Sequence, residues 1–157
     1  MGESAGGYLT CMAALDNDSS LDVGEYLSES SRVQAACPWY PPTDVTTFHY
    51  DNEEKCASAP ESLLMGFNIM RHTKEAIEKT PVSKVTKDAP PFLIIHGTDD
   101  HTVPFEQSVT LYDELMKNGC DVDFIALKGA DHADMQFFQD ELWDRIIDFF
   151  KDKLTAK

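Results

Sequence analysis

The sequence begins Met1-Gly2-Glu3-Ser4-Ala5-Gly6-Gly7, and its second to sixth residues fit the pattern G-x-S-x-G. In this pattern, the nucleophile elbow, a serine lies on a tight turn between a strand and a helix. Glycines lie two residues on either side because backbone approaches backbone there and leaves no room for a Cβ atom. Ser4 is therefore a candidate nucleophile. The pattern predicts a helix from Ser4 to Leu15 with core-facing Ala5, Leu9, Met12 and Ala13.

The composition describes a globular, strongly acidic chain. Its 157 residues are 42% hydrophobic and 10% aromatic, which suits one domain with a sizeable core. The net charge is −15, from 28 acidic and 13 basic residues, and no basic cluster is present. Nucleic acid and anionic membrane surfaces are therefore not expected as partners. The chain shows no signal peptide or transmembrane-length apolar run, and the compartment stays open, with the cytoplasm slightly favoured.

No cofactor or metal is expected from the residue spacing. The four cysteines, at 11, 37, 56 and 120, lack C-x-x-C spacing, which favours buried free thiols over a zinc site or a disulfide framework. The acid–histidine groups around Asp99 and Asp131 have neither i, i+4 ligand spacing nor a cysteine partner.

The first half of the chain contains one predicted strand and one insertion. Residues Arg32–Trp39 form a nearly continuous apolar run, which predicts a strand buried on both faces. The prolines from Pro38 onward are expected to end it. Residues 43–80 lack strand character and predict a lid-like helical insertion, with short helices over Pro60–Gly66 and Thr73–Lys79.

The second half alternates strands with helices. Strands are predicted over Phe92–His96 and Val122–Leu127, and helices over Pro104–Lys117 and Asp140–Leu154. The order predicts an α/β fold with about three parallel strands flanked by helices, joined by right-handed crossovers. Functional residues are expected at the carboxyl ends of the strands.

A serine, an acid and a histidine follow one another along the chain in the order that favours nucleophilic catalysis. A serine hydroxyl becomes a nucleophile when a histidine accepts its proton, and a carboxylate orients that histidine. Asp99 and Asp100 both follow a predicted strand, and spacing does not decide between them. His132 lies in the loop after the next strand. The plainer alternatives are a helix N-cap for Ser4, turn residues for the aspartates and a solvent-exposed loop histidine.

Two aromatic residues, Trp39 and Tyr40, follow the first predicted strand end. A substrate could pack against them there, and core or lid packing is an equal alternative.

The chain resembles the C-terminal part of an α/β-hydrolase. The similar branch contains acetylesterases and feruloyl-esterase-like carboxylesterases related to the hormone-sensitive-lipase group. The resemblance rests on residues 2–7, 31–36, 42–44, 90–104 and 128–132. The most specific segment is His96-Gly97-Thr98-Asp99-Asp100-His101-Thr102-Val103-Pro104.

The resemblance implies hydrolysis of carboxylic esters through an acyl-enzyme. It selects Asp100 as the acid through H-G-x-x-D-x-x-V-P, with Ser4 as nucleophile and His132 as base. The backbone N–H of Ala5 would be one oxyanion donor. Short acyl esters, including acetyl groups on sugars, are the implied substrates. The related pattern is Gly-His-Gly where this chain has Asp131-His132-Ala133. Replacement of both glycines is tolerable if the backbone there avoids positive φ.

The resemblance also implies a longer segment before the elbow, including the serine-bearing strand and a glycine-rich loop with the second oxyanion donor. Residues 1–157 are then a single partial domain with weakened activity. The edge of Val33–Cys37 would be bare and would favour self-association. Two alternatives remain: a serine peptidase of the prolyl-oligopeptidase type, and a catalytically inactive fragment that oligomerises.

Overall fold

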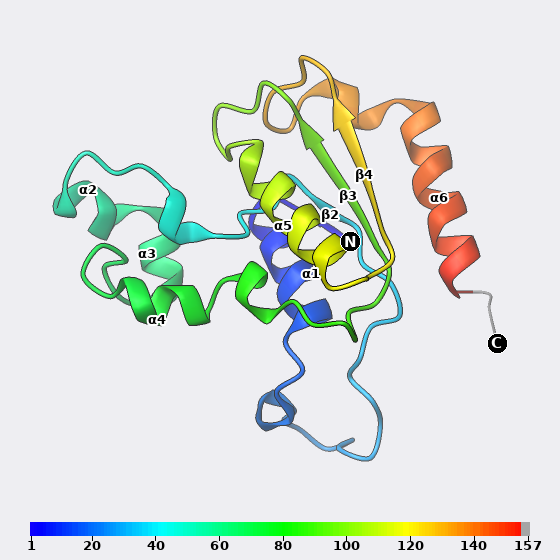
Figure 1. Cartoon of the computed structure of the whole chain (residues 1–157), viewed down its shortest axis with the longest axis horizontal. Helices are drawn as coiled ribbons and strands as arrows, with labels where there is room; N and C mark the ends of the chain where they lie inside the picture. The colour runs from blue at the N-terminus through cyan, green and yellow to red at the C-terminus, as the bar shows by residue number, and fades with distance from the viewer. Residues whose placement is uncertain (155–157) are drawn as a thin grey trace.

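The computed structural model describes residues 1–154 and contains a parallel sheet with strand order β1-β2-β3-β4. The strands are β1 (Gly2–Glu3), β2 (Pro38–Trp39), β3 (Phe92–Gly97) and β4 (Val122–Leu127), and Figure 1 shows β3 and β4 side by side. The α/β architecture is as expected. The sheet has one strand more than predicted because the elbow residues themselves pair with β2.

The region around β2 differs from the prediction. Residues 32–34 are exposed and form no strand, and Ala36 makes an isolated bridge to Phe92. Pro38 lies inside the strand that it was expected to end. The sheet tolerates this proline because the rungs around it use other groups: Cys37 and Trp39 accept hydrogen bonds through their carbonyls, and the Tyr40 N–H donates one. The outer strand at this edge is therefore β1, and association through the edge stays a prediction.

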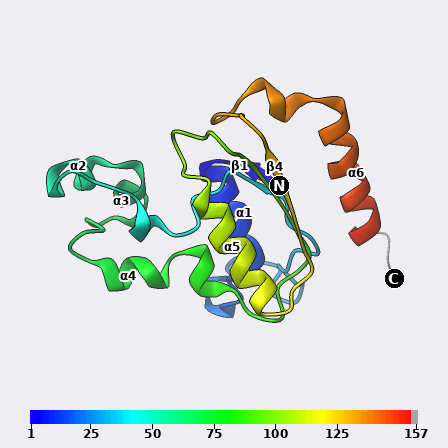
Figure 2. The same ribbon diagram turned by 45° about the horizontal axis from the view of Figure 1, so that its top comes forward.

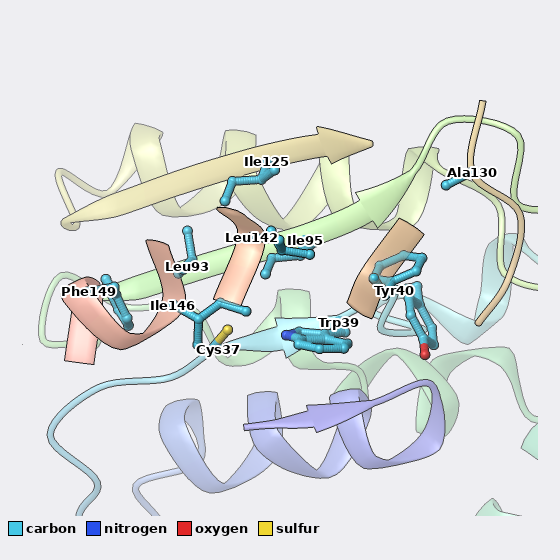
Figure 3. Close-up of a cluster of buried hydrophobic side chains, with 11 residues drawn as sticks. Cys37, Trp39, Tyr40, Leu93, Ile95, Ile125, Ala130, Leu142, Ile146 and Phe149 are labelled. Carbon is cyan, nitrogen blue, oxygen red and sulfur yellow. The ribbon is translucent and has the colours of Figure 1, made fainter. Parts of the chain in front are cut away.

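Three long helices cover the two faces of the sheet. Helix α1 (Ala5–Leu15) and helix α5 (Glu106–Lys117) share one hydrophobic cluster, with Cys11, Leu15, Leu111 and Leu115 against Phe92 and Ile94. Figure 2 shows α6 (Asp140–Leu154) on the other side. There its Leu142, Ile146 and Phe149 pack on Cys37, Trp39, Leu93, Ile95 and Ile125 (Figure 3). No helix within residues 1–154 is long and apolar enough to cross a membrane.

The buried face of α1 is not the predicted one. Its buried residues are Gly7, Tyr8, Cys11, Ala14 and Leu15, whereas Ala5, Leu9 and Ala13 are exposed and Met12 is half-buried. The helix is rotated so that Gly7, which has no side chain, approaches the Trp39 carbonyl. A Cβ atom at Gly7 would lie 2.7 Å from that oxygen. Tyr8, Cys11 and Leu15 also lie at helical spacing, so apolar spacing is compatible with either face. The close approach of Gly7 decides which face is buried.

The insertion of residues 43–80 projects to one side of the sheet (left in Figure 1). It contains the two predicted helices, α3 (Pro60–Met65) and α4 (Thr73–Glu78), and one that was missed, α2 (Glu53–Ser58). Its small core consists of Val45, Cys56, Ile69 and Ala76. The buried Gln107 side chain of α5 holds the base of the insertion through the backbone of Thr43 and Asp44. The role of this insertion as a lid stays a prediction.

Candidate active site

The turn between β1 and α1 places Ser4 at the edge of the sheet. Its backbone has φ 52° and ψ −117°, and its N–H donates to the Trp39 carbonyl at 3.0 Å. A Cβ atom on Gly2 would lie 2.4 Å from the Gly6 carbonyl oxygen, so this glycine is required by space. A Cβ atom on Gly6 would meet no atom within 4 Å. The spatial constraint expected on both sides of the serine therefore acts on Gly2.

The loop after β3 carries Asp100, whose side chain is fully buried. Its Oδ1 accepts the backbone N–H groups of Thr102 and Val103, both at 2.8 Å. Its Oδ2 lies 2.7 Å from Nδ1 of His132. Asp99 is exposed and accepts a hydrogen bond from the Thr98 hydroxyl. The geometry thus separates the two aspartates that sequence spacing left equal.

His132 joins the acid to the serine. Its Nε2 lies 3.0 Å from the Ser4 hydroxyl oxygen, and its Nδ1 faces the Asp100 carboxylate. An ionised carboxylate only accepts hydrogen bonds, so Nδ1 carries the proton and Nε2 presents its lone pair to Ser4. The side chain is 18% exposed, which leaves the site reachable from solvent. The three side chains are therefore arranged for proton removal from Ser4.

The loops that carry Asp100 and His132 are joined directly to each other. We call residues 98–103 the acid loop and residues 128–134 the base loop. The Thr98 N–H donates to the Leu127 carbonyl at 3.0 Å, and the Asp99 N–H donates to the Ala130 carbonyl at 3.1 Å. Gly129 N–H donates to the Thr98 hydroxyl at 2.9 Å. A Cβ atom on Gly97 would lie 2.3 Å from the Ala130 oxygen, so a glycine permits this close approach.

A second histidine, His96, lies fully buried beneath the acid loop. Its Nε2 is 3.0 Å from the Val103 carbonyl oxygen and 3.3 Å from Oδ2 of Asp100. Because a carbonyl can only accept, Nε2 carries the proton, and Nδ1 accepts from the Ser108 hydroxyl at 2.7 Å. Burial lowers the pKa of His96, which keeps it neutral. Through these contacts His96 braces the acid loop.

The backbone after His132 does not meet the condition that positive φ is avoided there. Ala133 has φ 55°, in the left-handed region that favours glycine. The Gly-His-Gly pattern was the available signal, because a glycine at this position indicates a left-handed backbone.

The structure places Trp39 and Tyr40 in the core, which favours the packing alternative over substrate contact. They are 4% and 1% exposed. Trp39 stacks on Phe137 at a centroid distance of 5.6 Å. The Tyr40 ring meets the His132 ring edge to face at 4.5 Å, and its hydroxyl donates to Glu3 at 2.5 Å. Burial and the Glu3 carboxylate raise the pKa of Tyr40 above its ordinary value.

Ala5 opens α1, so its backbone N–H has no acceptor within the helix and is available to an oxyanion. No group of three or more His, Cys, Asp or Glu side chains within the described part of the chain is arranged to hold a metal ion.

Two solved structures closely match the fold. One is described as a truncated form of a carbohydrate esterase from gut microbiota, with 30% identity and a TM-score of 0.88, over 99% of this chain and 59% of that chain. The other is a bifunctional GH43-CE protein of Bacteroides eggerthii, with 30% identity and a TM-score of 0.86, over 97% of this chain and 21% of that one.

A curated relative, the probable carboxylic ester hydrolase LipM of Mycobacterium tuberculosis, is 32% identical over 115 residues, which are 73% of this chain and 26% of LipM. The chain spans about a quarter to a third of the length of the curated relatives it matches. The BD-FAE family model matches residues 1–115. The chain therefore belongs to the BD-FAE family of esterases with the α/β-hydrolase fold.

Proposed function

We propose that this chain carries the catalytic triad of a serine carboxylesterase, with Ser4 as nucleophile, His132 as general base and Asp100 as the orienting acid. The observation that supports it is the continuous contact from Ser4 Oγ to His132 Nε2 at 3.0 Å and from His132 Nδ1 to Asp100 Oδ2 at 2.7 Å. Both distances are within hydrogen-bonding range before any substrate is bound. The φ of 52° at Ser4 is the strained backbone that a nucleophile elbow has at its serine, which also supports the proposal.

The proposed reaction forms and breaks an acyl-enzyme. Ser4 Oγ attacks the ester carbonyl carbon while His132 Nε2 takes the hydroxyl proton, and the Asp100 carboxylate stabilises the resulting imidazolium. The negative carbonyl oxygen is received by the Ala5 N–H, and one such donor contributes about 2.7–4 kcal/mol. The C–O bond to the alcohol then breaks, and His132 returns its proton to the departing oxygen. A water molecule then attacks the acyl carbon while His132 takes its proton. The bond from the acyl carbon to Ser4 Oγ breaks, His132 returns the proton to Oγ, and the carboxylic acid is released.

Short acyl esters of carbohydrates are the proposed substrates. A protein of similar structure is described as a carbohydrate esterase, which supports this choice. The net charge of −15 repels anionic esters and therefore favours neutral sugar esters as substrates. Acetate release from an acetylated oligosaccharide, with no cleavage of a proline p-nitroanilide, would support an esterase over a proline-specific peptidase.

The direct test is p-nitrophenyl acetate hydrolysis by the chain beside Ser4→Ala, with Ser20→Ala as the matched control at an exposed serine. We expect turnover to disappear in Ser4→Ala and to stay unchanged in Ser20→Ala. Equal turnover in all three folded proteins would contradict the assignment of Ser4. A folded chain without any Ser4-dependent turnover would contradict the esterase proposal for this chain and support the inactive-fragment alternative.

A further inference from the structure

One carboxylate that the mechanism above does not use lies between the two loops of the site. Asp131 Oδ1 accepts the backbone N–H of His101, on the acid loop, at 3.0 Å. The same oxygen accepts the backbone N–H of His132, on the base loop, at 2.7 Å. Its other oxygen, Oδ2, lies 3.3 Å from Nδ1 of the His101 ring. The Asp131 side chain therefore contacts two residues: His101, which follows the acid Asp100, and the base His132.

These contacts join the two loops closer to the reacting atoms than the hydrogen bonds described above. In the described part of the chain, the loops are joined beyond Ala130 by the Asp131 carboxylate and by the His132–Asp100 hydrogen bond. A carboxylate that accepts backbone N–H groups makes charge-assisted hydrogen bonds, which are shorter and stronger than neutral ones. The N–H groups of His101 and His132, in that order, lower the pKa of Asp131, so the acceptor stays ionised well into the acid range.

We propose that Asp131 is a positioning residue whose carboxylate holds His132 against Asp100 by receiving one backbone N–H from each loop. This proposal rests on the proposed esterase function and adds a residue that occupies the place of a glycine in the related pattern. Ala133, the residue after His132, has a left-handed φ of 55°, so the backbone changes direction just beyond the N–H that Asp131 accepts. Asp131 does not touch the reacting atoms. It acts through the position of His132.

The kinetic test compares Asp131→Ala with Asp131→Asn. Alanine removes the acceptor, and a misplaced base lowers kcat by about 10- to 100-fold. KM stays unchanged because the substrate is bound by other groups. Asparagine keeps an oxygen at the same place without the charge, and we expect it to restore kcat to within about fivefold of the original chain. The matched control is Asp99→Ala, which removes an exposed carboxylate of the acid loop and leaves kcat unchanged.

Three outcomes would overturn the proposal: equal kcat in Asp131→Ala and the original chain, a loss confined to KM, or an equal loss in the alanine and asparagine variants. The Ser4→Ala variant is measured in parallel. Loss of turnover in Ser4→Ala together with full kcat in Asp131→Ala would contradict this inference alone and would leave the esterase proposal intact.

A second measurement does not depend on turnover. Amide proton and nitrogen NMR shifts of His101 and His132 are followed from pH 6 downward, through the acid range in which Asp131 takes up its proton. The titratable residues in contact with Asp131 are His101, His132 and Asp134. The Oδ2 of Asp134 lies 3.3 Å from the Asp131 backbone nitrogen. We expect the two amides to shift together in the original chain and the common shift to disappear in Asp131→Asn. Amides that do not shift in the original chain would overturn the proposal, even if the chain proves inactive.

Discussion

The two sides of the candidate site are held in very different ways. The acid and base loops follow β3 and β4, which are paired over six residues from Phe92↔Val122 to Gly97↔Leu127. Further hydrogen bonds join these loops above the strands. Ser4 follows β1, which pairs with β2 at two positions, Gly2↔Pro38 and Glu3↔Trp39. Within residues 1–154, β1 has no strand on its other side.

Because of this difference in strand pairing, we expect changes on the two sides to affect the stability and the activity of the chain differently. The relative position of Asp100 and His132 depends on a long ladder, so a change that moves them also weakens the core. The position of Ser4 depends on a two-residue strand and one local turn, which a small change can shift without opening the core. We therefore expect damage on the Ser4 side to reduce activity before stability, and damage on the acid–base side to reduce both.

The largest effect is expected from breaking the acid–base side at the acid itself. In Asp100→Asn, His132 loses the carboxylate that selects its tautomer, and kcat falls by about 10³- to 10⁴-fold. In Asp99→Asn, an exposed neighbour is changed, and kcat stays close to that of the original chain. Both are measured by p-nitrophenyl acetate hydrolysis. A larger loss in Asp99→Asn would contradict the choice of the acid.

Two glycine substitutions compare the sides directly. In Gly97→Ala, the new Cβ atom would lie 2.3 Å from the Ala130 oxygen. Gly97 ends β3, which is paired with β4 over its whole length. We expect unfolding by urea to show a loss of about 3 kcal/mol, together with lower kcat. In Gly2→Ala, the clash of 2.4 Å with Gly6 is relieved by movement of the short β1 strand. We expect the free energy of unfolding to decrease by about 1 kcal/mol, with a fall in kcat comparable to that in Gly97→Ala.

The control for both is Gly6→Ala, where the added methyl group meets nothing within 4 Å and lies in a helix. Alanine there should raise the free energy of unfolding by about 0.5–1 kcal/mol. If Gly2→Ala destabilised the chain more than Gly97→Ala, the contrast between the two sides would be wrong.

A smaller gain is expected from relieving the base loop. In Ala133→Gly, the φ of 55° no longer strains a Cβ atom, so the free energy of unfolding rises by about 1 kcal/mol and the melting temperature by about 3 °C. The matched variant Ala126→Gly, at an exposed position of β4, should lower the melting temperature instead. Differential scanning calorimetry measures both, and a lower melting temperature for Ala133→Gly would show that this backbone is not strained.

The smallest effect is a pH dependence from His96. Burial lowers the pKa of His96 in the folded chain, whereas in the unfolded chain it is about 6.5. Below pH 6.5 the unfolded chain takes up a proton that the folded chain does not, so the free energy of unfolding falls as pH decreases. We expect the free energy of unfolding, measured by urea denaturation between pH 6.5 and pH 5, to fall less with decreasing pH in His96→Asn than in the original chain. His49→Asn, at an exposed site, should keep the original slope, and equal slopes in all three would contradict the role of His96.

Much of the second half of the chain was predictable from its sequence. The apolar run of β3, the strand Val122–Leu127 and the helix Asp140–Leu154 follow local patterns, and the structure confirms them. The loop positions of Asp100 and His132 follow from those strands because carboxyl ends of parallel strands share one edge. The choice of Asp100 over Asp99 needed a family pattern. In the structure, the backbone N–H groups of residues 102 and 103 separate the two, because both donate to the Asp100 carboxylate.

The first half was less predictable because backbone contacts override side-chain patterns there. The orientation of α1 depends on the close approach of Gly7 to Trp39, which apolar spacing does not encode. The strand at Pro38 survives because neighbouring residues supply the rungs. The bridging role of Asp131 depends on a contact with His101, thirty positions away, and spacing alone carries no signal for it.

The most direct test of the central claim is fluorophosphonate labelling of the chain, followed by mass spectrometry of the labelled peptide. We expect one adduct, on Ser4, because Ser4 is the serine whose hydroxyl contacts the His132 ring. We expect the adduct to be lost in His132→Gln while the variant stays folded. A folded chain that remains unlabelled, or one labelled equally with and without His132, would contradict an assembled triad of Ser4, His132 and Asp100.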